Sequence, residues 1–129
     1  MRLTHDPLEE VGETLSPDGK LAAYISDWNL HVVPTDGGTP QPLTLQGDEN
    51  HLYGRLDWVY QEELYGRGNF QGFWWSPDSR RIACLILDES EVPEYTIPDH
   101  RKTRPEVEVW RYPKAGDPNP KASLAVLDA

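Results

Sequence analysis

The chain has 129 residues, of which 12 are Lys or Arg and 22 are Asp or Glu, so its formal net charge is −10. This length supports one small domain or part of a larger one, and the acidic balance without a basic run argues against a nucleic-acid partner. No apolar run approaches the roughly 20 residues needed to cross a bilayer, and the N-terminus lacks the apolar core of a signal peptide. We expect either that the mature chain is soluble or that an upstream targeting segment has been cut away. If the chain is part of a larger protein, that parent protein could be cytoplasmic or periplasmic/extracellular.

Residue usage favours β-structure. The apolar residues lean to Val, Ile, Tyr and Trp, and they are interspersed with 12 prolines and 10 glycines, as expected of short strands joined by turns. The single cysteine, Cys84, lies in the apolar run from Arg81 to Leu87. It can form no internal disulfide, so we expect it to be a buried, small apolar side chain.

The first part of the chain predicts four strands. Alternation places Ala23 and Ile25 on one face of a strand, and Leu30 and Val32 on one face of the next. The segment Thr35–Gly38 predicts a hairpin turn, because glycine accepts the positive φ that such turns require. The predicted strands span residues 11–15, 21–26, 29–33 and 41–45, and the prolines near the last one are typical of an exposed edge.

Two short motifs recur at different spacings. Leu3-Thr4 recurs 40 residues later as Leu43-Thr44, whereas Ser-Pro-Asp-Gly at 16–19 recurs 60 residues later as Ser-Pro-Asp-Ser at 76–79. A repeat of about 40 residues with four short strands is typical of a propeller blade, so the longer spacing indicates an insertion of about 20 residues. We predict an all-β fold: about two four-stranded antiparallel blades of an incomplete β-propeller, with one short helical insertion. Blade one takes about 11–45, the inserted segment about 46–69 and blade two about 72–128.

The second blade predicts strands at residues 73–75, 81–88, 107–110 and 122–127. The stretch Glu89–Pro105 between them is polar and carries three prolines, so we expect a loop there. Trp74 and Trp75 fall on opposite faces of their strand, which predicts that one lies in the core and the other packs against a neighbouring blade or the insertion. Because two blades alone leave apolar faces and strand edges uncovered, we expect the isolated chain to self-associate.

The insertion carries the chemistry of most interest. Asp57 is a suitable N-cap, and Trp58–Leu64 contains no Gly or Pro, so a helix of about two turns is expected before Gly66. Glu62 and Glu63 are adjacent on it. Two carboxylates repel each other, and a protonated peptide N-terminus would reverse that repulsion by charge and by its N–H donors. The alternative is that both acids form a solvated face. A glycosidase site fits less well, since its carboxylates must flank the scissile bond.

Other candidate sites carry weaker signals. The histidines are scattered and belong to no metal-binding motif, so each is expected on the surface or in a loop; they are His5, His31, His51 and His100. Asp88–Glu91 lacks the glycine and the ligand spacing of a calcium loop. We expect no metal site and no cofactor.

Four motifs resemble the N-terminal propeller of the dipeptidyl peptidase IV family, which are prolyl oligopeptidase-type serine peptidases. They are Asp-Trp-Val-Tyr-Gln-Glu-Glu-Leu-Tyr at 57–65, Phe-Trp-Trp-Ser-Pro-Asp at 73–78, Glu-Val-Pro-Glu-Tyr at 91–95 and Tyr-Pro-Lys-Ala-Gly-Asp-Pro-Asn-Pro at 112–120. The resemblance runs from about Ser16 to Asp128. It implies a fragment of an exopeptidase that releases N-terminal Xaa-Pro or Xaa-Ala dipeptides.

The resemblance also implies roles for individual residues. By motif, Glu62 and Glu63 bind the free α-amino group of the peptide substrate, whereas Gln61 stands where related enzymes often carry a third acid and receives no binding role. The family's Ser, Asp and His lie in a C-terminal α/β-hydrolase domain, which would be the partner of this chain. No serine here lies in a Gly-x-Ser-x-Gly motif, so no catalytic residue is assigned and the chain alone should be inactive.

A different class of function stays open. The chain could belong to a noncatalytic propeller module that binds other proteins, with the acidic insertion as its docking surface. A reading frame that continues into more blades and a Gly-x-Ser-x-Gly motif would favour the peptidase, and one that ends without them would favour the binding module.

Overall fold

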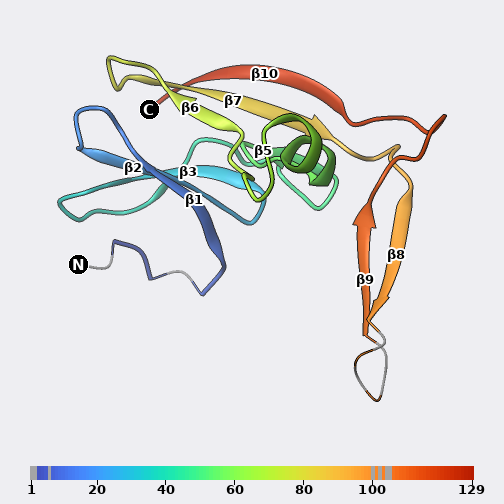
Figure 1. Cartoon of the computed structure of the whole chain (residues 1–129). Helices are drawn as coiled ribbons and strands as arrows, with labels where there is room; N and C mark the ends of the chain where they lie inside the picture. The colour runs from blue at the N-terminus through green and yellow to red at the C-terminus, as the bar shows by residue number, and fades with distance from the viewer. Residues whose placement is uncertain (1–2, 6, 100, 102, 104–105) are drawn as a thin grey trace.

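The computed structural model describes residues 3–5, 7–99, 101, 103 and 106–129. Within these described residues, ten strands and one short helical element follow one another (Figure 1). Their bounds are β1 Glu10–Leu15, β2 Leu21–Ser26, β3 Asn29–Pro34, β4 Gln41–Pro42, β5 His51–Tyr53, η1 Tyr60–Leu64, β6 Phe73–Trp75, β7 Arg81–Asp88, β8 Glu94–Asp99, β9 Glu106–Arg111 and β10 Lys121–Asp128. Within the described part of the chain, no helix is long and apolar enough to span a membrane.

The first sheet is the predicted four-stranded blade, with the strand order β1-β2-β3-β4 and antiparallel pairing throughout. Strand β2 has the predicted bounds, and its side chains alternate between two apolar environments. Ala23 and Ile25 face the second sheet, whereas Ala22 and Tyr24 pack on the opposite face with Val33. The last strand is shorter than predicted, because only Gln41 and Pro42 pair with β3.

The second sheet differs from the prediction in its strands. Its order is β10-β7-β5, and β6 pairs with β7 on the same edge as β5. Leu52 pairs with Leu87 and Phe73 pairs with Cys84, so two separate strands line one edge of β7. Strand β5 falls inside the range 46–69 expected for the insertion. The excursion therefore leaves from within an edge strand of this sheet, since β5 and β6 are its two halves.

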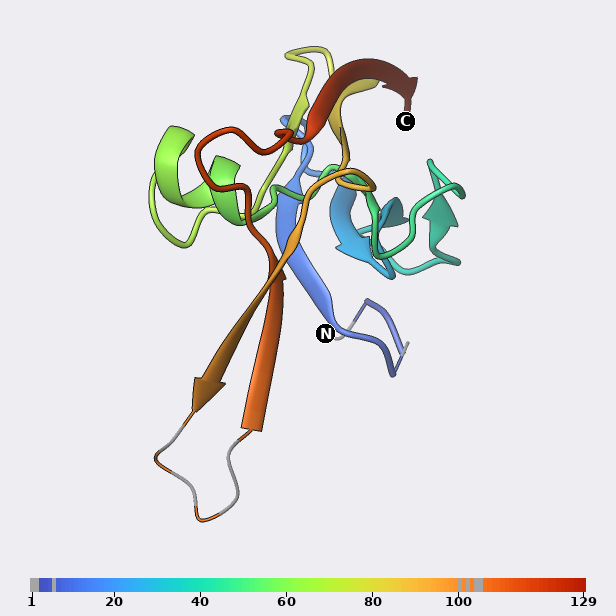
Figure 2. The same ribbon diagram turned by 90° about the vertical axis from the view of Figure 1, so that its right-hand side faces the viewer.

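The stretch predicted as a polar loop, Glu89–Pro105, contains strand β8, and this part of the prediction was wrong. Strand β8 pairs with β9 in a separate two-stranded sheet, so the predicted strand at 107–110 does not join the second blade. Pro98 is tolerated because both strands of this hairpin are edge strands. Figures 1 and 2 show the hairpin extending away from both blades. Pro105 lies outside the described residues.

The main core lies between the two sheets. Its fully buried members come from both of them and include Ile25, Leu30, Phe73, Ile82 and Cys84. Burial raises the pKa of the Cys84 thiol to about 12, so this side chain is an apolar core residue, as predicted. Packing between blades is what makes neighbouring blades mutually stabilising.

The repeated Ser-Pro-Asp turns adopt the same geometry and touch each other. Ser16 Oγ donates to Asp18 Oδ1 over 2.8 Å, and Ser76 Oγ donates to Asp78 Oδ1 over 2.6 Å. The turn residues Gly19 and Ser79 both have positive φ, of 71° and 62°. The Asp18 amide donates to Ser79 Oγ over 3.0 Å, so the two turns are joined across the blades.

Apolar side chains remain exposed on the outer strand β10, and they predict self-association of the isolated chain. Leu124 is 63% exposed and Val126 is 64% exposed. Sedimentation velocity should show dimers or larger species. The substitution Leu124→Lys should weaken association roughly 10- to 100-fold, because a buried Leu contributes roughly 1.5–3 kcal/mol. The variant Gln46→Lys is the matched control for the added charge, and a compact monomer at high concentration would contradict the prediction.

Candidate functional site

The base of the insertion is fixed by backbone contacts to β7. Gly54 N–H donates to Leu85 O and Leu85 N–H donates to Gly72 O, each over 2.8 Å, so the two flanks meet at one residue of β7. Gly72 N–H also donates to Gly54 O over 2.7 Å. A Cβ on Gly72 would lie 3.2 Å from the Gly54 carbonyl, and Gly54 has φ of 75°. Both positions therefore favour glycine, and the intervening residues project as a unit.

Asp57 caps the helix of the insertion, as predicted. Its Oδ1 accepts the Tyr60 N–H over 2.8 Å, and Gln61 N–H donates to Asp57 O over 3.1 Å. After this first turn the helix widens, because Tyr65 N–H donates to Tyr60 O five residues earlier over 2.9 Å. Tyr60–Leu64 is thus π-helical, whereas the sequence predicted an ordinary helix. Such turns are rare and are frequent at functional sites.

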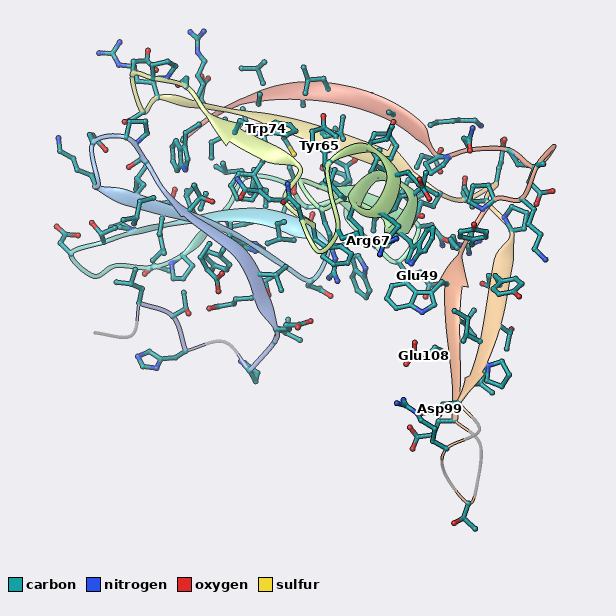
Figure 3. All side chains as sticks on the ribbon, viewed as in Figure 1. Glu49, Tyr65, Arg67, Trp74, Asp99 and Glu108 are labelled. Atoms are coloured by element: carbon teal, nitrogen blue, oxygen red, sulfur yellow. The ribbon has the colours of Figure 1, made fainter. Side chains whose placement is uncertain are left out.

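Aromatic contacts hold the insertion on two sides. The Trp58 ring packs edge-on against Tyr112, with ring centroids 4.7 Å apart, and so contacts the segment that follows the hairpin. On the other side Tyr65 contacts Trp74, with centroids 6.0 Å apart, and Figure 3 shows these two side chains together beside the helix. Trp75, on the opposite face of β6, packs on the core. This confirms the prediction that one of these tryptophans lies in the core and the other packs against a neighbouring blade or the insertion.

Glu62 and Glu63 differ in their surroundings. Glu62 forms an ion pair with Arg67, with 2.5 Å between Oε1 and Nε, and its side chain is 19% exposed. Glu63 is exposed and lines a hollow of about 250 Å³ together with Tyr60, Asn119 and Pro120. Both acids lie on the same π-helical turn, which sits beside the blades at the level of β5 and β6 (Figures 1 and 2).

Gln61, between Tyr60 and the acid pair, faces inward. Its side chain is 5% exposed, and its Oε1 accepts the Gly68 N–H over 2.8 Å. The amide therefore closes the loop that carries Arg67 back onto the helix. Gln61 is therefore buried, and it stabilises the loop that follows the helix.

A pair of buried acids behind the helix was not predicted from sequence. Asp57 is 4% exposed and Glu89, which follows β7, is 6% exposed, and the two carboxyl groups lie close enough to influence each other's pKa. Burial raises the pKa of Asp57. Burial, and then the charge of Asp57, raise the pKa of Glu89 to about 7, against a smaller lowering by Arg111. Asp57 and Glu89 are far apart in sequence, so only the fold reveals the pair.

The described histidines, His5, His31 and His51, belong to no metal-binding group. His31 stacks on Tyr24 with ring centroids 5.3 Å apart, and His51 Nδ1 lies 2.9 Å from Asp48 Oδ1. His5 is exposed, and His100 lies outside the described residues. Among the described positions, which include all of Asp88–Glu91, no group of three or more His, Cys, Asp or Glu side chains could hold a metal ion.

Comparison with known protein families gives one match over nearly the whole chain. The family model described as the dipeptidyl peptidase IV (DPP IV) N-terminal region matches residues 2–129. Curated relatives include the probable dipeptidyl-aminopeptidase B of Penicillium rubens, 37% identical over 125 residues, and the dipeptidyl aminopeptidase B of Saccharomyces cerevisiae, 36% identical over 128 residues. These alignments cover 88% and 92% of this chain but only 14% and 15% of the relatives.

Solved structures give the same result for the fold. The chain is similar to dipeptidyl peptidase 4 from Porphyromonas gingivalis, with a TM-score of 0.84 and 36% identity over 96% of this chain and 18% of that one. It is also similar to a putative dipeptidyl aminopeptidase IV from Bacteroides ovatus, with a TM-score of 0.67 and 25% identity over 91% of this chain and 15% of that one. The predicted fold class is confirmed: the chain is all-β and forms blades of an incomplete β-propeller.

The buried Gln61 predicts a loss of stability on truncation. In Gln61→Ala the Gly68 N–H loses its acceptor, which should lower the free energy of unfolding by about 1–3 kcal/mol. Urea unfolding measures this change. The isosteric variant Glu63→Gln at the exposed neighbouring position is the control and should stay within about 0.5 kcal/mol of the parent. Equal stability of the two variants would contradict the supporting role of Gln61.

Proposed function

The chain belongs to the dipeptidyl peptidase IV N-terminal region family, and from this premise we propose that Glu62 and Glu63 bind the free α-amino group of a peptide substrate. The observation that carries the proposal is the placement of both acids on one capped helical turn within a family-matching chain. A peptide α-amino group has an ordinary pKa of about 7.7–8.0, so it is largely a cation at neutral pH. Two carboxylates supply the counter-charge and accept its N–H groups.

The fixed position of Glu62 and Glu63 supports a role in setting the distance between the substrate N-terminus and the bond to be cleaved. Asp57 Oδ1 accepts the Tyr60 N–H at the start of the helix, and Gln61 Oε1 accepts the Gly68 N–H of the following loop. Ring contacts of Trp58 and Tyr65 hold the two ends of the helix. A fixed amine-binding point sets how far a peptide reaches from its N-terminus. It therefore selects which peptide bond meets a reactive group held elsewhere.

The reaction proposed for the parent protein is release of N-terminal Xaa-Pro or Xaa-Ala dipeptides by a serine exopeptidase. The chain spans about 14–15% of the length of the curated relatives described above, so the catalytic groups are assigned to a C-terminal α/β-hydrolase domain of the parent. The contribution of this chain is binding and orientation of the substrate N-terminus.

A second candidate function is protein binding by a noncatalytic propeller module, and the β8–β9 hairpin is the observation that favours it. Large apolar side chains are exposed along both strands: Tyr95, Ile97, Val107, Val109 and Trp110. An apolar patch of this kind is typical of an interaction surface. Hydrolysis of a dipeptide substrate by the protein as encoded would decide in favour of the peptidase.

Removing the charge of either Glu62 or Glu63 should weaken substrate binding. In the protein as encoded, Glu62→Gln and Glu63→Gln should each lower kcat/KM for a free-amine Xaa-Pro substrate by roughly 10- to 100-fold, since a hydrogen bond to a charged group contributes about 1.5–3 kcal/mol. Steady-state kinetics measures the change. Glu108→Gln, on the hairpin away from the helix (Figure 3), is the control. Unchanged kcat/KM in both Glu62→Gln and Glu63→Gln would overturn the proposal that these acids bind the substrate amine.

Arg67 competes with the substrate amine for Glu62. Its side chain is 84% exposed, and an exposed ion pair contributes about 0.2–1 kcal/mol. The variant Arg67→Gln should therefore lower KM about two- to fivefold and leave kcat unchanged, with a smaller difference at high salt. Arg101→Gln is matched, because Arg101 is 89% exposed and pairs with Asp99 on the hairpin (Figure 3). A KM that rises in Arg67→Gln would show that Arg67 assists binding.

A further inference from the structure

The helix that carries Glu62 and Glu63 rests on a buried polar contact. Asp57 begins this helix, and its Oδ1 is satisfied by the Tyr60 N–H. Its second oxygen, Oδ2, is buried and is reached by no N–H group or hydroxyl of the described residues. An unsatisfied buried carboxylate oxygen is costly, so a donor for Oδ2 must come from elsewhere.

Glu89 is placed to be that donor. Its backbone is fixed on both sides, because its N–H donates to Asn50 O over 2.8 Å and its carbonyl accepts the Val92 N–H over 2.9 Å. Its side chain is buried, and its carboxyl group lies close enough to that of Asp57 for each to influence the pKa of the other. A hydrogen bond between two carboxyl groups requires one proton, since two carboxylates have no donor. A protonated Glu89 supplies the missing donor to Oδ2.

We propose that Asp57 and Glu89 share one proton, and that this pair is a positioning device that holds the Glu62–Glu63 helix against the segment leading into the β8–β9 hairpin. The inference rests on the amine-binding role proposed above for Glu62 and Glu63. Neither Asp57 nor Glu89 touches the substrate in this arrangement. They act by fixing the start of the helix, and Glu62 follows Asp57 by little more than one turn.

The charged groups around the pair come from several elements. The charge of Arg111, on β9, lowers the pKa of Glu89, and the Arg111 guanidinium also donates to Val92 O over 2.7 Å and to Glu94 over 3.4 Å. Glu89 and Arg111 line a hollow of about 490 Å³, whose other charged residues are Glu49, Arg55 and Glu94. The cation that lowers the pKa of Glu89, Arg111, is thus also engaged by other acceptors, which leaves the proton shared with Asp57 as the main neutralising partner of Glu89.

The sign of the pH dependence follows from the folded and unfolded states. The pKa of Glu89 is about 7 in the folded protein and 4.5 ordinarily, so the folded protein binds the extra proton in this window. The contribution of Glu89 to stability is therefore present below about pH 4.5 and is lost as the pH rises to about 7. Above that pH both acids are ionised and repel each other, which loosens the helix start.

The test uses Glu89→Gln in the protein as encoded, because the Gln amide donates to Asp57 at every pH. The KM for a free-amine Xaa-Pro substrate is measured from pH 5.5 to 9. At pH 5.5 the variant should match the wild type, and at pH 8.5 its KM should be about tenfold lower, with kcat unchanged. Deprotonation of the substrate amine affects both proteins and cancels in the ratio.

Two further variants separate positioning from general destabilisation. Glu89→Ala removes the donor, so its KM should be higher than that of Glu89→Gln at every pH. Glu91→Gln, in the same loop with its acid exposed and paired with Lys121, should behave like the wild type at every pH. A KM ratio between the wild type and Glu89→Gln that stays flat across the pH range would overturn the positioning role.

A readout without substrate separates this inference from the proposed function. The Tm of the wild type should fall relative to that of Glu89→Gln as the pH rises from about 4.5 to about 7, so that the gap between the two widens. A flat difference would overturn the shared proton, whatever the kinetics show. If the Tm difference follows the pH but Glu62→Gln and Glu63→Gln keep the wild-type KM, the shared proton stands and the amine-binding proposal fails.

Discussion

The position of the inserted helix depends on one edge of β7, with which two separate strands pair. Strands β5 and β6 both pair with β7, and the chain between them leaves and returns at a single residue, Leu85. Because both flanks are tied to the same strand, the excursion has a fixed origin on the blade. The helix then needs only a few contacts to be held in one orientation, and these come from Asp57, Trp58 and Tyr65.

Local signals made part of this fold predictable from sequence. The alternation in Leu21–Ser26 and the apolar run Arg81–Asp88 gave strands with the observed bounds, and the absence of Gly and Pro after Asp57 placed the helix. What sequence missed depends on distant partners. Strand β5 exists because His51–Tyr53 pairs with β7, and β8 exists because its partner β9 returns alongside it. The prolines of Glu89–Pro105 weighed against a strand there, although Pro98 lies within β8 and an edge strand tolerates it.

The candidate site divides in the same way. The adjacent acids Glu62 and Glu63 and the cap at Asp57 are visible in one short motif, and so they were predictable. The pairing of Asp57 with Glu89 joins residues on different elements, and the ion pair of Glu62 with Arg67 depends on the turn through Gly68. The chain therefore uses acids in two physical settings. One pair is near solvent and suits a cation, whereas the other is buried and suits a proton.

The joined Ser-Pro-Asp turns have a consequence for how the blades are aligned. Gly19 adopts its left-handed backbone without strain, but Ser79 holds the same conformation with a side chain, at a cost of about 1–2 kcal/mol. In return its hydroxyl accepts the Asp18 N–H of the other blade. A glycine in place of Ser79 would remove the backbone strain of its own turn, but it would also remove the acceptor for the Asp18 N–H of the other turn. Ser79 therefore helps to align the two neighbouring sheets. Its side chain is unfavourable for its own left-handed backbone but provides the hydrogen-bond acceptor for Asp18 in the other sheet.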